Sequence, residues 1–368
     1  MELVVRKTDL LKELALLQGI VERKNTIPIL ANVLIEASKN SVSLLATDLD
    51  VGLRSKCEAV VSKPGTLTLP AKKLFEIVNA LPDTDIRIDE DKGGKSVTVA
   101  ADRFESRMQT LPASEFPTPP SDAGQVEATL PGGALKRMIS HTRFAITSED
   151  TRYFLNGAQL VLRPDSLSMV ATDGHRLAFV SVNESPGAGV KTDVLLPRKT
   201  LSEVARLIDG GAAVEFSQGE NHLFFKADGR LLISRKIDAN FPAYERVIPK
   251  SNDKRIEFDR DRLSAAVRRV RLLSNERSKA VKFMIAKDQV EITSSTPEVG
   301  EAHEVLPVEY GGPSMQICFN ADYVDNFLSV VEAESVELEF KDEMSQAVMK
   351  PIGAEGYSYT YVIMPMRI

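Results

Sequence analysis

One pattern of segments recurs three times along this chain of 368 residues. The copies lie about one third of the chain apart; Pro70 and Pro197, for example, stand in matching segments 127 positions from each other. A repeated unit of this length predicts a series of similar domains. The total length also fits two or three domains of ordinary size. Short polar stretches separate the copies, so we expect domains at 1–122, 126–250 and 254–368.

Each copy contains two helix-like segments among strand-like ones. The first helix has apolar residues on one face, as at Leu10, Leu14 and Leu17, and the second begins just after a proline in two of the three copies. Runs of alternating apolar and polar residues predict three strands between the helices and three or four after the second. The predicted fold class is therefore α+β, with three repeated domains of two helices packed on antiparallel sheet.

Composition narrows the classes of protein that the chain can be. Apolar residues make up 43% and charged residues 27%, enough for each domain to bury a core. No apolar stretch approaches a signal peptide or the ~20 residues of a membrane span. Cys57 and Cys318 stand alone, which predicts reduced thiols and a cytoplasmic protein. The net charge of −6 is compatible with an acidic exterior around a basic channel.

The sequence carries no motif for catalysis or metal binding. GxSxG, Walker and GxGxxG patterns are absent, and the four histidines form no HxH or HxxxH pair. The segment TDGHR around His175 could suggest an acid–base pair, but a structural or binding role requires fewer assumptions. We therefore expect no catalytic residue, no cofactor and no metal.

Ten segments, in order along nearly the whole chain, resemble the beta subunit of bacterial DNA polymerase III, the beta sliding clamp family. They include NTIPILANVLIEA, RYFLNG, VATDGHRLA, FPAYERVIPK, LLSNER and YVIMPMRI. The resemblance implies a head-to-tail dimer that forms a six-domain ring, with helices around the hole and sheets outside. It also implies a processivity factor that encircles duplex DNA. The implied partners are double-stranded DNA of any sequence, the DNA polymerase III alpha subunit, the clamp loader complex, other proteins with clamp-binding motifs and a second copy of the chain.

Lysine and arginine residues lie on most of the predicted lining helices, and RRVR at 268–271 is the densest group. Cations on a helix facing DNA attract phosphates without reading bases, which suits a sliding protein. Ordinary solvated helix faces carry similar charges, so charge alone leaves both interpretations open. Seven positions match the family's DNA contacts: Lys24, Lys72, Arg152, Tyr153, Phe154, Arg198 and Lys199.

The resemblance further implies a cleft that binds peptide segments of partner proteins. Apolar side chains would form the groove, and flexible methionines would let it accept varied peptides. A terminal edge strand that only packs against its neighbours would be apolar as well. The matched cleft positions are Leu155, Thr172, Gly174, His175, Arg176, Leu177, Pro242, Arg246, Val247, Asn320, Tyr323, Val362, Ile363, Met364, Pro365, Met366 and Arg367.

The subunit contact implied by the family packs Leu272 and Leu273 on Phe104 of the partner. The two leucines would fit a core position equally well by periodicity. Charged residues that could add ion pairs at this contact are Arg103, Arg107, Glu298, Glu301 and Glu304.

Two other functions stay open on sequence grounds. One is an enzyme acting on nucleic acid with TDGHR in its site, which turnover would reveal. The other is a structural ring that binds only protein, which would show no salt-dependent retention on circular DNA.

Overall fold

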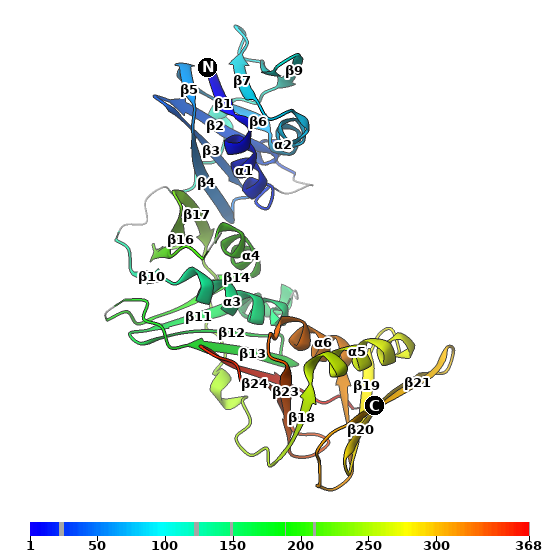
Figure 1. The fold of residues 1–368 in the computed structure, drawn as a ribbon. Coiled ribbons are helices and arrows are strands. Elements are labelled where there is room, and N and C mark those ends of the chain that lie inside the picture. Colours follow the sequence, from blue (N-terminus) through cyan, green and yellow to red (C-terminus); the bar gives the residue numbers. More distant parts are fainter. Residues whose placement is uncertain (22–25, 121–124, 148–149, 188, 209–210, 368) are drawn as a thin grey trace. The chain divides into compact units, whose positions relative to one another are not determined.

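The computed structural model describes residues 1–21, 26–120, 125–147, 150–187, 189–208 and 211–367 (Figure 1). The chain divides into two compact units. The first unit holds residues 1–133 and 199–236, and the second holds residues 134–198 and 237–368. No helix in the described ranges is long and apolar enough to span a bilayer.

The first third of the chain runs strand, helix, strands, helix, strands. Before and between its helices it has β1 (Glu2–Arg6), α1 (Lys7–Leu17), β2 (Asn32–Ser38), β3 (Ser41–Thr47), β4 (Val51–Glu58), β5 (Val60–Lys63) and β6 (Gly65–Pro70). It continues with α2 (Ala71–Ala80), β7 (Asp85–Glu90), β8 (Ser96–Ala101) and β9 (Phe104–Gln109). The short strand β5 has no counterpart in the described parts of the other two thirds.

The second and third thirds repeat this order. The second has β10 (Ala128–Leu130), α3 (Gly132–Thr142), β11 (Gly157–Arg163), β12 (Ser166–Thr172), β13 (Arg176–Val182), β14 (Thr192–Pro197), α4 (Arg198–Leu207), β15 (Val214–Gln218), β16 (His222–Ala227) and β17 (Arg230–Arg235). The third has β18 (Lys254–Asp259), α5 (Arg260–Val270), β19 (Ala280–Ala286), β20 (Gln289–Thr296), β21 (Gly300–Pro307), β22 (Met315–Asn320), α6 (Ala321–Val330), β23 (Ser335–Phe340), β24 (Ala347–Ile352) and β25 (Ser358–Ile363).

The prediction of three strands between the helices was too low, because the first third has five there. The second and third thirds have four there, because β14 and β22, like β6 in the first third, run directly into the second helix. Pro70 and Pro197 end two of these strands. A proline lacks the backbone N–H that a strand interior needs, but a helix start leaves that donor unused. Three strands follow each second helix.

Each helix buries one face. On α1 the buried residues include Leu10, Leu14 and Leu17, and on α2 they include Leu74 and Val78. Helices α1 and α2 pack on each other, as do α5 and α6. Burying a leucine or valine side chain contributes about 1.5–3 kcal/mol, so these stripes hold the helices to their sheets.

Each unit contains one eight-stranded antiparallel sheet that joins two thirds of the chain. In the first unit the order is β10-β15-β16-β17-β4-β3-β2-β6, and in the second it is β14-β11-β12-β13-β25-β24-β23-β18. We call the β17–β4 pairing the first joint and the β13–β25 pairing the second joint. The remaining sheets are β5-β1-β7-β8-β9 in the first unit and β21-β20-β19-β22 in the second.

Candidate functional site

The hairpin between β12 and β13 forms a tight polar turn at the second joint. The Asp173 carboxylate accepts hydrogen bonds from the backbone N–H groups of His175 (2.9 Å) and Arg176 (3.1 Å). The Thr172 hydroxyl donates to the Arg176 carbonyl (2.6 Å) and accepts from the Gly174 N–H (3.1 Å). Gly174 has φ +87°, a conformation that residues with a Cβ rarely adopt. The turn therefore leaves the His175 side chain exposed.

The C-terminal tail continues from β25 and lies along this hairpin. The Met364 N–H donates to the His175 carbonyl (3.0 Å), and the Met366 N–H donates to the Cys318 carbonyl on β22 (2.8 Å). These two bonds hold the tail between β13 and β22, so its apolar residues do not fray as chain ends usually do. Met364, Pro365 and Met366 are half-buried, and Arg367 is exposed.

A buried apolar cluster includes Val362 of β25, the strand that leads into the tail. Its buried members are Val170, Leu177, Val348 and Val362. Half-buried side chains packed against it are Phe179, Phe241, Tyr244, Val247 and Ile248. The rings of Phe179 and Tyr244 stack with centroids 5.5 Å apart. Half-buried apolar groups beside a buried floor are the surface that an apolar peptide side chain can cover.

Sequence comparison of motifs found Leu177, Val247 and Val362 but missed most of this cluster. Val170 and Val348 lie in runs of consecutive buried residues on β12 and β24, and Phe179 lies on β13, where burial alternates only from Ala178 onward. Apolar runs of this kind were the available signal, but they identify buried strand residues without saying which of them border a binding surface.

The other cleft positions fall around this cluster in the second unit. Leu155 and Ile363 are buried, while Pro242 and Arg246 are exposed. Asn320 caps α6, because its side-chain oxygen accepts from the Asp322 N–H (2.9 Å). Tyr323 lies on the first turns of α6 and is half-buried.

Arg176, one of the predicted cleft positions, is nearly buried among groups of its own chain. Its side chain is only 9% exposed and forms an ion pair with Asp173, with Nε and Oδ2 2.9 Å apart. Burial alone would lower the pKa of the guanidinium, but the neighbouring Tyr361 and Asp173 raise it. The charge is therefore retained and is balanced inside the protein.

The predicted DNA contacts at 152–154 lie beside this hairpin. Tyr153 is 59% exposed, and its ring meets Phe154 edge-on with centroids 6.0 Å apart. A Cβ placed on Gly174 would stand 2.6 Å from Nη1 of Arg152, so the Arg152 guanidinium lies over the turn. The structure thus brings Arg152 next to the cleft residue Gly174, which the sequence did not indicate.

The remaining DNA candidates have different environments. Lys72 is exposed, with Glu76 3.9 Å away, and Arg198 is exposed. Lys199 instead holds two segments of the first unit together. Its ammonium donates to the Ile20 carbonyl (3.0 Å) and pairs with the nearly buried Asp48 carboxylate. Lys24 lies outside the described residues.

The RRVR segment is balanced by acidic residues. Arg268 pairs with Asp325 (2.6 Å), Arg269 with Glu304 (2.5 Å) and Arg271 with Asp322 (3.1 Å). The Glu304 carboxylate raises the pKa of Arg269, and the Arg269 guanidinium lowers that of Glu304. The densest basic run in the sequence is therefore not a set of unpaired cations.

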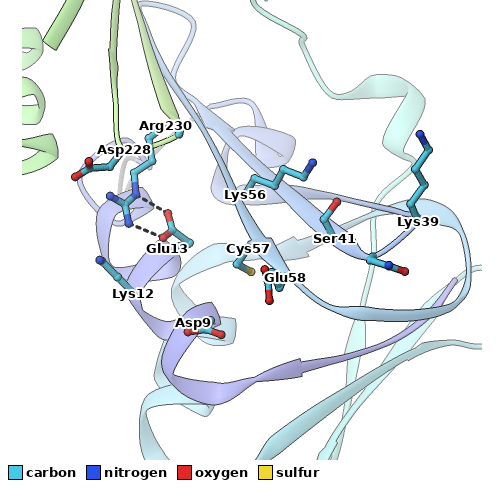
Figure 2. Close-up of a pocket in the computed structure, with 12 residues that line it drawn as sticks. Asp9, Lys12, Glu13, Lys39, Ser41, Lys56, Cys57, Glu58, Asp228 and Arg230 are labelled. Carbon is cyan, nitrogen blue, oxygen red and sulfur yellow. Dashed lines mark hydrogen bonds and ion pairs between the residues drawn. The ribbon is translucent and has the colours of Figure 1, made fainter. Parts of the chain in front are cut away.

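A hollow of about 850 Å³ lies at the first joint (Figure 2). Two short hydrogen bonds join Arg230 to the Glu13 carboxylate at its edge, and Cys57 lies nearby. Burial raises the pKa of the Cys57 thiol to about 12, and the charges of Glu13 and Asp9 add to the effect. The thiol therefore stays protonated at neutral pH, which excludes a thiolate nucleophile there. In the described residues no group of three His, Cys, Asp or Glu side chains is arranged to hold a metal ion.

Apolar residues are exposed on the edge strands β9 and β21 and next to β21. Phe104 on β9 is 42% exposed, Leu272 is 76% exposed and Leu273 is half-buried. Val299 and Val305, in and beside β21, are 67% and 48% exposed. Two of the charged residues that could form intersubunit ion pairs are already paired within the chain, Arg107 with Asp91 and Glu304 with Arg269.

Three copies of one α+β domain, joined through continuous sheets, define the architecture of a DNA sliding clamp. Profiles of the DNA polymerase III beta subunit match the chain over its whole length: the N-terminal domain at residues 1–120, the central domain at 129–243 and the C-terminal domain at 245–367. The chain belongs to the DNA polymerase III beta subunit family, the beta sliding clamps.

Individual relatives agree with this assignment. The chain is 37% identical to the beta sliding clamp of Pseudomonas putida and 35% identical to that of Escherichia coli K12, with 100% of each chain covered. Its fold matches the crystal structure of a Pseudomonas aeruginosa sliding clamp bound to griselimycin with a TM-score of 0.93, at 35% identity and full coverage of both chains. A sliding clamp from Bartonella birtlesii bound to griselimycin matches equally well, at 32% identity. The chain is thus a processivity factor of DNA polymerase III and catalyses no reaction of its own.

Proposed function

We propose that two copies of the chain close head to tail into a ring around duplex DNA. The observation that carries this proposal is the pattern of sheet edges. At both joints, the last strand of one domain pairs with a strand of the preceding domain, the third one after that domain's first helix. These pairs are β17 with β4, and β25 with β13. The counterparts of these strands, β9 and β21, are left at sheet edges. Pairing β9 with β21 of a second copy repeats the joint between subunits and closes the ring.

The exposed apolar residues support this contact. Leu272 and Leu273 of one copy would cover Phe104 of the other, removing apolar surface from water. An edge strand with unpaired backbone groups is also a ready template for pairing with another chain. Arg103, Glu298 and Glu301, which pair with no described residue, would lie on the rim of the contact.

DNA would be held by charge rather than by base contacts. Lys24, Lys72, Arg152 and Arg198 would attract phosphates, and the exposed ring of Tyr153 could stack on an unpaired base. Phe154 would support that ring edge-on. Lys199 would act indirectly, because its ammonium is already engaged by Asp48 and the Ile20 carbonyl.

Partner proteins would bind at the second joint. The apolar cluster, the tail methionines and the exposed hairpin would together form a groove for an apolar peptide, which suits the DNA polymerase III alpha subunit, the clamp loader complex and other proteins with clamp-binding motifs. We further propose that griselimycin, the ligand named for two relatives, binds this chain in the same cleft.

We place this protein in the cytoplasm, with domains at 1–122, 126–250 and 254–368. The family profiles support a threefold division, although their second boundary, at 243–245, lies a few residues earlier. The DNA-bound role in replication supports the location.

The deciding experiment loads the protein onto nicked circular DNA with its clamp loader and then linearises half of the sample. We expect the protein to stay on circles through a salt wash and to leave the linear DNA, because a ring slides off ends. A loader-free sample is the matched control. Equal retention on circular and linear DNA would mean direct chemical binding and would contradict the ring.

A further inference from the structure

The guanidinium of Arg176 makes three polar contacts with three different segments. Its Nε bonds the Asp173 carboxylate (2.9 Å), its Nη1 bonds the side-chain oxygen of Asn326 (2.8 Å) and its Nη2 bonds the Phe144 carbonyl (2.6 Å). Asp173 belongs to the β12–β13 hairpin, Phe144 follows α3 and Asn326 lies on α6. Each nitrogen of the guanidinium therefore has a partner.

Two aromatic rings add to this set. The guanidinium carbon lies 4.2 Å from the ring centroid of Tyr323 and 5.3 Å from that of Phe144. A planar cation stacked on a ring and bonded at its edges is fixed in orientation as well as in position. Because the side chain is only 9% exposed, losing any one contact leaves a buried donor without water to replace it.

The segments that Arg176 connects carry the two sides of the cleft. The hairpin presents Gly174 and His175, and the first turns of α6 present Asn320 and Tyr323. The same hairpin receives the tail through the bond from the Met364 N–H to the His175 carbonyl. A shift of the Arg176 side chain would therefore move one side of the cleft relative to the other.

We propose that Arg176 is a positioning residue: by joining the hairpin to α6 it sets the width of the partner cleft. Asn326, which is outside the cleft, holds the Arg176 side chain in place. This inference rests on the proposed function of the cleft as the partner site. Its physical basis is preorganisation: a cleft already held at the bound width loses less freedom when a ligand enters. A lysine could keep the charge but not the three-way contact, because its ammonium lacks the planar fork.

Asn326→Leu is the sharpest test, since it removes one partner of Arg176 at a distance from the ligand. We expect the dissociation constant for griselimycin, measured by calorimetry on the full-length protein, to rise about threefold, and about tenfold for Arg176→Lys. Asn326→Asp restores an oxygen acceptor and should recover the wild-type affinity. Ser329→Ala is the matched control, because Ser329 lies on the same helix and bonds only the Asn326 carbonyl among the contacts described.

Hydrogen exchange separates positioning from a general loss of stability. In Asn326→Leu the Met364 amide should exchange faster, because its acceptor is the hairpin carbonyl of His175, while amides of the first unit keep the wild-type exchange rate. Wild-type affinity in Asn326→Leu would overturn the positioning role and leave the cleft standing. Uniformly faster exchange in both units would also overturn it. A wild-type protein that fails to bind griselimycin would overturn the cleft proposal itself, and the positioning role with it.

Discussion

The first and second joints use the same strand pairing but are closed by different chemistry. At the first joint, Arg230 at the start of β17 forms a two-bond ion pair with Glu13 of α1, and both side chains are 7% exposed. At the second joint, Tyr359 of β25 donates to the His141 carbonyl of α3 (2.9 Å), and their rings meet edge-on at 4.9 Å. One joint therefore depends on compensated charge and the other on aromatic packing.

The outer sides of the two joints differ as well. Gly52 and Leu177 are equivalent, because each pairs with the threonine that ends the preceding strand, Thr47 or Thr172. A Cβ on Gly52 would stand 3.1 Å from Pro119, so the chain's own segment occupies that position. Phe116 in the same segment is buried in a cluster with Ile29, Leu30, Leu34 and Leu45. The chain's own segment thus packs beside the first joint. Among the described residues only Ala113 is half-buried against that cluster, whereas five larger half-buried apolar side chains pack against the cluster at the second joint.

The largest expected effect comes from breaking the ion pair of the first joint. Glu13→Ala leaves the Arg230 guanidinium buried without its carboxylate, so the free energy of unfolding should fall by about 3–5 kcal/mol. Urea titration of the variant and the wild type measures the difference. Removing both charges in Glu13→Leu with Arg230→Met should cost much less, because no unpaired charge stays buried. A double variant as unstable as the single one would show that the joint depends on these side chains for shape rather than for charge.

The proposed intersubunit joint should be weaker than either internal joint. Leu272→Ala with Leu273→Ala removes apolar contact at the ring closure and should weaken dimer association by about 2–4 kcal/mol. Analytical ultracentrifugation across a dilution series measures this shift, and Val60→Ala, which changes an exposed valine on β5, is the control. A double variant that sediments as a full dimer at the lowest concentration would place the contact elsewhere.

The stability of the second joint should fall more than that of the first when the pH is lowered. His141 is 2% exposed; its Nδ1 lies 2.8 Å from the Arg137 carbonyl and its Nε2 has no partner in the described residues. Burial lowers the pKa of His141 below its ordinary value of about 6.5 and outweighs the opposing effects of the hydrogen bond to the Arg137 carbonyl and the charge of Glu332; the charge of Arg137 adds a smaller lowering. The folded state therefore binds the proton less readily than the unfolded state.

Because the unfolded chain binds that proton first, the stability contributed by neutral His141 is fully present above pH ~6.5 and is lost as the pH falls toward the lowered folded pKa. The slope from one proton is at most about 1.4 kcal/mol per pH unit. Melting temperatures of the wild type and His141→Phe between pH 5 and 7.5 measure it. The two slopes should differ in that window, and parallel curves would show that His141 does not titrate there.

Sequence reasoning reached the repeat and the fold class because each leaves a local pattern, whereas the cleft positions came from the family resemblance and stay a prediction. Leu10, Leu14 and Leu17 show the helix face, and the tail methionines stand in one recognisable segment. It did not reach contacts between residues far apart in the chain. The Glu13–Arg230 pair spans 217 positions, and the pairing of RRVR with Asp322, Asp325 and Glu304 joins separate elements. A charged residue in a sequence does not indicate which distant residue of opposite charge will lie beside it in the folded protein.

The smallest effect concerns Cys57 at the first joint. Cys57→Ala should change the free energy of unfolding by less than about 1 kcal/mol, since the thiol bonds no described residue and its removal leaves no buried charge without a partner. Its reactivity is the sharper measure. With a pKa near 12, the thiol should react with iodoacetamide about a thousandfold more slowly than a free cysteine. Because the Glu13 carboxylate helps to raise that pKa, Glu13→Gln should speed the reaction. Glu332→Gln is the control and should not change the rate, because the charge of Glu332 acts on His141 at the second joint. An unchanged rate in Glu13→Gln would mean that the charge of Glu13 at the first joint does not influence the pKa of the thiol.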